Sequence, residues 1–399
     1  MDLLPLSLLL LVALLGHGLF WAAVLNRLHA VAMPRWITDT LSSLCFACLL
    51  LIPVVFGWWL AVAGFQVFAS LRWGEISARP VAAAWLLYLL VCWIVATAAV
   101  TYWVWRGLWH RPPHVLRSQR ARSVVLGPDP RRATTEEHGH HFLVHLPRNE
   151  SLLLDVTERV IEVPRLAAAL DGLSLVHVSD FHFTGRVAKG YFHEVVRLCN
   201  EMQPDLVAVT GDLVDKSRCV DWIPETLGQL QGRHGVYFVL GNHDVRVGVA
   251  RLRRVLGECG LVDLGGRFVQ LEIRGEPVVL AGNELPWLAP AADFGRCPPA
   301  NGNGPLRIAL SHSPDQFAWA PANDVDLLLA GHTHGGQFRF PLAGAIVTPS
   351  RQGVKYASGV FYAPPTIMHV TRGISGNFPL RLNCPPELSH LLLRAVKRR

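Results

Sequence analysis

The stretch LSLVHVSDFH, residues 173–182, places a short apolar run directly before a cluster of polar side chains, Ser179, Asp180 and His182. The same order recurs after apolar runs at 206–209, 236–240, 308–310 and 327–330. The polar clusters that end these runs are Thr210-Gly211-Asp212, Gly241-Asn242-His243-Asp244, Ser311-His312-Ser313 and Gly331-His332-Thr333-His334. Short apolar runs bounded by turn residues are typical of buried strands.

The spacing of the first three clusters predicts an α/β fold. Asp180 and Asp212 lie 32 residues apart, and Asp212 and Asn242 lie 30 residues apart, which is the size of a strand-helix-strand unit. Residues 191–199, between the first two runs, have helical character. Open α/β sheets bind ligands beyond the carboxyl ends of their strands. We therefore expect all five clusters at one sheet edge of a globular domain that begins near residue 150.

The clusters contain seven side chains of the kinds that bind metal ions: Asp180, His182, Asp212, Asn242, His312, His332 and His334. A mixed set of imidazole, carboxylate and amide oxygen ligands suits Mn, Fe, Zn or Mg. Seven ligands exceed what one ion needs, and a carboxylate shared by two ions would acidify a bridging water and clamp a phosphoryl group. One such cluster alone would be weak support, but five in order predict a hydrolase of phosphate esters.

The order D-x-H, GD, GNHD, H and GHTH resembles that of the calcineurin-like metallophosphoesterases, from about residue 165 to the C-terminus. The resemblance implies a four-layer α/β/β/α sandwich, in which two packed mixed sheets are flanked by helices. It also implies two divalent ions and attack by a water that bridges them on a phosphate ester or diester. Asp180, His182, Asp212 and His334 would hold the first ion, and Asp212, Asn242, His312 and His332 the second.

The resemblance further implies that His243 faces the substrate, where it protonates the leaving oxygen or stabilises the charge that develops there. Imidazole is suited to proton donation near neutral pH. Asp215 matches the second Asp of a GDxxD pattern and would pair with His243, although a helix N-cap or first-turn acid accounts for it almost as well. Lys216 stands where protein serine/threonine phosphatases carry an Arg, which disfavours a phosphoprotein substrate.

Three further tracts resemble a bacterial, membrane-associated branch of predicted phosphoesterases: Gly335-Gly336-Gln337, Tyr356-Ala357-Ser358-Gly359 and Arg372-Gly373. Some members of that broader group hydrolyse a lipid-linked pyrophosphate, the UDP-diacylglucosamine of lipid A synthesis, and others act on phosphodiesters. A nucleotide-lipid pyrophosphate is therefore an alternative substrate. The tracts also have purely structural explanations, since glycine permits close backbone approach and the YASG tract could be a strand and its turn.

The N-terminal part of the chain contains three apolar runs, at 3–25, 41–71 and 81–105, without Asp, Glu, Lys or Arg. A helix of about 20 apolar residues spans a hydrocarbon core of roughly 30 Å. The first run could instead be a cleaved signal peptide, but Met1-Asp2 supplies no basic region before it. We expect a three-helix transmembrane anchor over 1–110, a basic linker over 111–150 and the metallophosphoesterase domain over 151–399.

The net charge of +7 is concentrated beside the third run. Residues 106–132 contain one acid, Asp129, and the seven arginines Arg106, Arg111, Arg117, Arg120, Arg122, Arg131 and Arg132. Lys and Arg near helix ends stay on the cytoplasmic side, so we expect a multi-pass protein of the plasma (inner) membrane with a cytoplasmic catalytic domain. The same charge would attract anionic lipids of the bilayer. Because the rest of the chain is almost neutral, no nucleic acid partner is expected.

Other features point to packing rather than to a second site. The eight cysteines lack a regular spacing, which excludes a disulfide-stapled mini-protein and favours a reducing compartment. Cys45 and Cys48 are expected to pack inside the second helix, and His138, His140 and His141 to be solvated rather than to bind metal. A non-catalytic scaffold or transport component is the competing class, but all seven ligands are present, and within the runs His17 and small hydroxyls appear, without the Asp, Glu, Lys or Arg that transport predicts.

Overall fold

The structure is a computed structural model, and it describes residues 3–63, 80–109, 111–126, 143, 146–297 and 304–396. The chain divides into two compact units. The first, which we call the helical unit, comprises residues 1–111 and 341–353, and the second, the sheet unit, comprises residues 112–340 and 354–399. No pattern in the sequence predicts that residues 341–353 belong with the N-terminal helices. The predicted histidine cluster at 138–141 lies outside the described residues.

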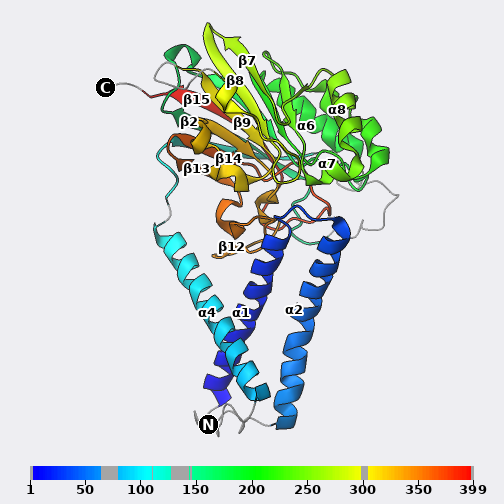
Figure 1. The fold of residues 1–399 in the computed structure, drawn as a ribbon, viewed down its shortest axis with the longest axis vertical. Helices are drawn as coiled ribbons and strands as arrows, with labels where there is room; N and C mark the ends of the chain where they lie inside the picture. The colour runs from blue at the N-terminus through cyan, green and yellow to red at the C-terminus, as the bar shows by residue number, and fades with distance from the viewer. Residues whose placement is uncertain are drawn as a thin grey trace. The chain divides into compact units, whose positions relative to one another are not determined.

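The helical unit contains three helices that are long and apolar enough to cross a membrane (Figure 1): α1 (Leu3–Leu28), α2 (Arg35–Ala63) and α4 (Pro80–Trp109). Helix α2 begins six residues before the uncharged run that predicted it. Its first residue, Arg35, forms an ion pair of 3.1 Å with Asp39, one helical turn later. Residues 64–71 of the predicted run lie outside the described residues.

His17 joins the three helices through hydrogen bonds. Its Nε2 lies 2.9 Å from the carbonyl oxygen of Leu49 in α2, and its Nδ1 lies 2.6 Å from the hydroxyl of Tyr88 in α4. Pro53 lacks an N–H and cannot bond to the Leu49 carbonyl four residues earlier, so that carbonyl is free to accept from His17. His17 therefore donates through Nε2 and accepts the Tyr88 hydroxyl proton at Nδ1.

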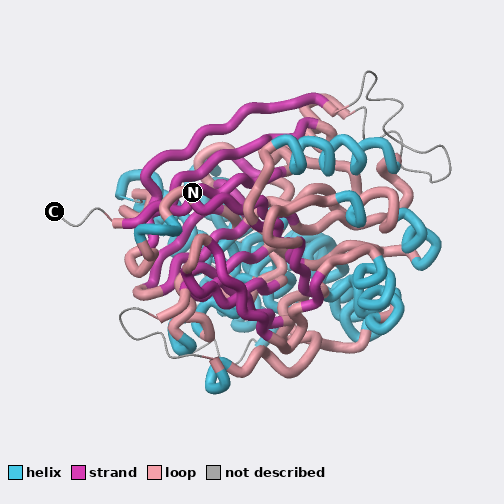
Figure 2. The backbone as a smooth tube through the Cα atoms, turned by 90° about the horizontal axis from the view of Figure 1, so that it is seen from above, coloured by secondary structure: helices cyan, strands magenta, loops and turns pink. Residues whose placement is uncertain are grey.

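The sheet unit contains two mixed sheets, whose strands are magenta in Figure 2. The seven-stranded sheet has the order β1-β2-β15-β3-β4-β5-β6, formed by β1 (Leu116–Val125), β2 (Leu153–Val163), β15 (Glu387–Ala395), β3 (Leu173–Val178), β4 (Leu206–Thr210), β5 (Val236–Val239) and β6 (Val262–Asp263). The six-stranded sheet has the order β13-β14-β10-β9-β8-β7, formed by β13 (Gly359–Ala363), β14 (Thr366–Val370), β10 (Leu327–Ala330), β9 (Leu306–Ser311), β8 (Glu276–Asn283) and β7 (Phe268–Ile273). Two short strands, β11 (Arg339–Phe340) and β12 (Gly344–Ala345), follow β10 along the chain.

All five apolar runs predicted as strands are strands in the structure, namely β3, β4, β5, β9 and β10. The helix expected near 191–199 is α6 (Lys189–Glu201). The segment expected to be a linker contains a strand, β1, which pairs antiparallel with β2 at the edge of the sheet. None of the residues of β1 is buried, so this strand has no buried face and leaves no alternation of apolar and polar residues in the sequence.

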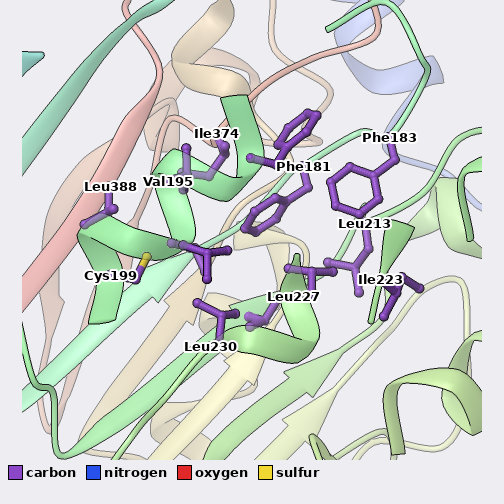
Figure 3. Close-up of a cluster of buried hydrophobic side chains, with 14 of the residues drawn as sticks. Phe181, Phe183, Val195, Cys199, Leu213, Ile223, Leu227, Leu230, Ile374 and Leu388 are labelled. Carbon is purple, nitrogen blue, oxygen red and sulfur yellow. The ribbon is translucent and has the colours of Figure 1, made fainter. Parts of the chain in front are cut away.

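Three apolar cores hold the layers together. The core between the sheets packs Leu173 and Leu175 of β3 against strands of the other sheet, including Ile308 and Leu327. The outer face of the seven-stranded sheet packs against α6 and α8 (Val249–Glu258), and Figure 3 shows part of this core around Phe181 and Val195. A short helix, α7 (Asn242–Val247), precedes α8.

The outer face of the six-stranded sheet is covered by short 3₁₀ segments, which replace the α-helical layer of a regular four-layer sandwich. These segments are Phe294–Arg296, Pro314–Ala318 and Pro321–Asn323. Phe294, Phe317 and Ala320 from them pack against Leu328 and Met368 of the sheet. The fold is thus an α/β sandwich of two mixed sheets, preceded by three long apolar helices.

Candidate metal centre

The seven predicted metal ligands converge at the carboxyl ends of five strands. Asp180 and His182 follow β3, Asp212 follows β4, and Asn242 lies three residues after the end of β5. His312 follows β9 and His332 follows β10, so the cluster draws on both sheets. Strands β3, β4 and β5 are parallel neighbours, as are β9 and β10, which brings their carboxyl ends to the same edge.

The backbone around the cluster is held in conformations that side chains rarely adopt. Five of the seven predicted ligands have a positive φ: 55° at Asp180, 45° at His182, 52° at Asp212, 70° at His332 and 50° at His334. Each such residue costs about 1–2 kcal/mol relative to the right-handed region. Strain of this kind persists where the surrounding structure enforces it, and it gathers at functional sites.

Two glycines permit the close approach of the loops. A Cβ at Gly241 would lie 2.2 Å from Oδ1 of Asp212, and a Cβ at Gly331 would lie 2.5 Å from Oδ2 of Asp180. Any side chain at either position would therefore displace a carboxylate of the cluster.

The first group of ligands consists of Asp180, His182 and His334, whose ligand atoms all lie within 4.8 Å of one another. The Nε2 atoms of His182 and His334 face each other at 3.1 Å. Oδ1 of Asp180 lies 3.5 Å from Nε2 of His334 and 3.8 Å from Nε2 of His182. Asp212 is next to this group, with Oδ2 3.7 Å from Nε2 of His182.

The second group consists of Asp212, His312 and His332. Nε2 of His312 lies 3.2 Å from Oδ2 of Asp212, 3.0 Å from Nδ1 of His332 and 3.2 Å from Oδ1 of Asn242. Asp212 thus lies between the two groups, where the resemblance placed a shared ligand.

Hydrogen bonds to acceptors outside the cluster orient three of the four imidazoles. Nδ1 of His182 donates to Asp215, Nδ1 of His312 donates to the carbonyl of Thr210, and Nδ1 of His334 donates to the carbonyl of Ser375, at 2.7, 2.7 and 3.2 Å. A ring that donates through Nδ1 is left with Nε2 for a ligand, and such outer partners fix the tautomer of metal-binding histidines. In each of these rings Nε2 is the atom that points into the cluster.

The imidazoles of the two groups have pKa values that are shifted in opposite directions. Burial lowers the pKa of His182 and His312, but nearby carboxylates outweigh it and raise the pKa of both to about 9. Burial, together with these protonated neighbours, holds the pKa of His334 and His332 well below the ordinary value. Each facing pair of nitrogens therefore shares one proton, and a divalent ion that binds there would replace it.

His332 gives the clearest sign that a ligand belongs here. Its Nε2 is buried and has no hydrogen-bond partner among the described residues, while its Nδ1 faces another imidazole nitrogen. A buried polar atom without a partner is rare and requires an explanation. The donor set, the facing nitrogens and this unpartnered ring together fit borderline or hard divalent ions.

His243 and Asp215 lie beside the first group. Asp215 accepts hydrogen bonds from Nδ1 of both His182 and His243. Although burial opposes it, these two imidazoles hold the pKa of Asp215 well below its usual range. Nε2 of His243 lies 3.9 Å from Oδ2 of Asp212, so by distance alone His243 also forms a ligand group with His182 and Asp212.

Three further residues support the cluster, and the sequence analysis did not assign them a role. Asp244 is fully buried and accepts from the backbone N–H groups of Leu213, Val214 and Gly241, which ties the two loops around Asp212 together. Burial and the charge of Asp212 raise its pKa to about 7. The sequence did contain a sign of this role, since Asp244 is the last residue of the GNHD motif.

The other two supporting residues had no signal in the sequence. Trp287 places its ring 4.8 Å from that of His332 and 5.6 Å from that of His312. Arg381 is buried and donates to the carbonyls of Arg372 at 2.9 Å and His334 at 3.4 Å, which braces the loop that carries His334. Trp287 and Arg381 both lie far in sequence from the predicted ligand histidines that they contact, so spacing could not reveal them.

Comparison with known proteins gives a consistent result. The family model described as Calcineurin-like phosphoesterase matches residues 173–336. The chain is 30% identical over 225 residues to the uncharacterized metallophosphoesterase YkoQ of Bacillus subtilis, covering 54% of this chain and 82% of that protein. It is 29% identical over 226 residues to phosphodiesterase YaeI of Escherichia coli, covering 55% and 81%. It is also 29% identical to a bovine transmembrane protein with a metallophosphoesterase domain, covering 60% and 57%.

Proposed function

Because the chain belongs to the calcineurin-like phosphoesterase family, we propose that it is a membrane-anchored hydrolase that cleaves a phosphate ester or diester at a centre of two divalent ions. The observation that carries this proposal is the pair of ligand groups that meet at Asp212. A diester substrate is supported by the relative YaeI, which is named a phosphodiesterase.

In this proposal Asp180, His182, Asp212 and His334 hold one ion, and Asp212, Asn242, His312 and His332 hold the other. Two such ions, when bound, make a shared water acidic and neutralise the charge on a phosphoryl group. Asp215 and the carbonyls of Thr210 and Ser375 act indirectly, because each accepts a hydrogen bond that orients a ligand imidazole.

His243 is the proposed proton donor to the leaving oxygen. Asp215 accepts from its Nδ1, so the ring is held with Nε2 directed at the Asp212 side of the cluster. A histidine in this position gives up a proton as the ester bond breaks, and the neighbouring carboxylate keeps the ring oriented.

A lipid-linked pyrophosphate is the second candidate substrate, favoured by the three apolar helices, which would keep the enzyme at a bilayer. We also propose that the sheet unit faces the cytoplasm, since Arg106 and Arg111 lie at the end of α4 and Arg117 and Arg120 soon after it. A reporter that is active on one side of the membrane, fused after Arg399, tests this placement.

Hydrolysis by the full-length protein in detergent tests the proposed function. A phosphodiester, a phosphomonoester and a nucleotide-lipid pyrophosphate are compared, with Mn and with a chelator. Asp212→Ala should abolish turnover, whereas Asp221→Ala, which removes a carboxylate that is exposed on the surface, should leave it unchanged. Absence both of turnover and of bound metal in the wild type would revive the scaffold interpretation.

A further inference from the structure

Residues 340–350 form an uncharged, apolar segment, FPLAGAIVTPS, between Arg339 and Arg351. Three of its apolar side chains are exposed: Leu342 fully, and Phe340 and Val347 each to 49%. Leu342 also has a φ of 66°, which is unusual for a leucine. An exposed apolar side chain at the tip of a turn, held in a strained backbone, calls for a partner.

The second half of this segment is bonded to the end of α1 within the helical unit. The side chain of Asn26 is buried, although it lies in the last turn of a helix that is apolar enough to cross a membrane. Its Nδ2 donates to the carbonyl of Ile346 at 3.1 Å, and its Oδ1 accepts from the N–H of Thr348 at 2.8 Å. The carboxamide thus satisfies the two backbone groups that a neighbouring strand would satisfy.

The hydrogen bonds to Asn26 indicate the depth at which residues 340–350 lie in a bilayer. Arg27, next to Asn26, and Arg35, at the start of α2, mark the place where α1 leaves the apolar layer. Three crossings by α1, α2 and α4 also put everything after α4 on the side of the membrane where α1 ends. Residues 340–350 therefore lie on the side of the membrane where α1 ends, and at the depth of the lipid headgroups and outer acyl chains.

We propose that the turn Phe340–Val347 is a membrane-contact segment, which inserts Leu342 into the interfacial layer of the bilayer beside the end of α1. Burial of apolar side chains in that layer is favourable. The segment begins six residues after His334 in the sequence, so the metal-binding loop continues directly into the part of the chain that contacts lipid.

Environment-sensitive fluorescence on the full-length protein in lipid vesicles tests the proposal. A nitrobenzoxadiazole label is attached at Leu342→Cys and, as a matched control, at Val262→Cys, an exposed valine of β6 in the sheet unit. Wild-type protein treated in the same way measures any label on the native cysteines. Quenchers are doxyl groups on lipid acyl chains and iodide in the water.

We expect blue-shifted emission at 342, with quenching by doxyl lipid and protection from iodide, and the reverse at 262. Quenching by iodide at 342 as strong as at 262 would overturn the proposal. Protection at 342 from both quenchers would also overturn it, because the occupant would then be protein. Asn26→Leu should reduce the lipid quenching at 342, since the bond to the segment is lost.

A further experiment asks whether the segment serves catalysis, and this experiment rests on the proposed function. Leu342→Asp, a residue that tolerates positive φ, should lower turnover of a phosphodiester embedded in vesicles and leave turnover of a water-soluble diester unchanged. Equal rates of the variant and the wild type on both substrates would show that the segment does not serve catalysis. If the wild type cleaves neither substrate, the proposed function fails while the fluorescence result still decides the membrane contact.

Discussion

Two clusters of buried polar side chains lie in the sheet unit, and they differ in how fully their hydrogen bonds are satisfied. The metal centre contains nitrogens that face each other at 3.0–3.1 Å and, in His332, a buried atom without a partner. The other cluster, which we call the inter-sheet network, consists of Arg159, His177, His369 and Glu387 with their neighbours, all of them buried.

Every bond of the inter-sheet network has a defined direction. Arg159 can only donate, so Nε2 of His369 must accept from it at 3.1 Å. Nδ1 of His369 then donates to Nδ1 of His177 at 2.8 Å, and Nε2 of His177 donates to Thr210 at 2.9 Å. Glu387 balances the charge through ion pairs with Arg159 at 2.6 Å and Arg372 at 3.1 Å. Buried polarity alone therefore does not identify a ligand site.

The largest effect should come from removing one ligand of the metal centre. His312→Ala deletes an imidazole that contacts Asp212, Asn242 and His332, so the second ion loses its site. We expect activity to fall by at least about 10³-fold, the upper range for the loss of one charge-stabilising group. Bound metal per chain, measured by mass spectrometry of the elements, should fall with it.

His193→Ala is the matched control, because His193 is an exposed histidine of α6. Its activity and metal content should equal those of the wild type. Full activity of His312→Ala would mean that the cluster is another satisfied network, and the contrast between the two clusters would disappear.

The inter-sheet network should respond in stability rather than in metal content. Glu387→Gln leaves Arg159 buried without its charge partner, and breaking a buried ion pair in this way costs about 3–5 kcal/mol. Chemical denaturation should show this loss both with and without added metal. Asp221→Asn, which removes an exposed partner of Arg251 at 3.4 Å, should cost less than about 1 kcal/mol. A small effect of Glu387→Gln would show that the network tolerates loss of its charge balance.

The two clusters were not equally predictable from the sequence, and the reason is physical. Residues such as Asp180 and His332 directly follow apolar runs, and a polar group after a buried strand must lie at the sheet edge. His177 and His369 lie inside the strands β3 and β14, where burial depends on which face each occupies and on the partner sheet. A single sequence does not contain that pairing. Residues 341–353 were missed for the same reason, since their partner Asn26 lies more than 300 residues away.

The pH dependence of folding stability should show the effect of one residue of the inter-sheet network, His177. Burial lowers the pKa of His177 to about 3, against 6.5 when it is exposed. Above pH 6.5 both the folded and the unfolded chain carry a neutral ring, so the pKa shift has no effect. As the pH falls from 6.5 toward 3, the unfolded chain takes up a proton that the folded chain refuses. Folding stability then falls by about 1.4 kcal/mol per pH unit.

His177→Gln removes this titration while its amide can still accept from His369 and donate to Thr210. Chelator-treated protein should therefore lose about 1.4 kcal/mol more between about pH 7.5 and pH 5.5 in the wild type than in the variant. Equal losses would mean that His177 is protonated in the folded state and that the proposed hydrogen-bond directions are wrong.

The smallest effect is expected in the helical unit, where His17 forms a third buried polar cluster. Tyr88→Phe removes the hydroxyl that donates to His17 and that accepts from Trp21 at 3.3 Å. Hydrogen bonds between membrane helices contribute about 0.6 kcal/mol on average and about 1.7 at most, because separated helices also find partners for these groups. Unfolding by a denaturing detergent in mixed micelles should show a loss in that range.

Tyr102→Phe is the matched control, since Tyr102 lies on the same helix and is 37% exposed. A loss for Tyr88→Phe as large as that for Glu387→Gln would place the His17 cluster with the inter-sheet network. A small loss for Tyr88→Phe would show that loss of a neutral hydrogen bond between membrane helices costs little. A large loss then requires, as in Glu387→Gln, that a charged side chain be left buried without its partner.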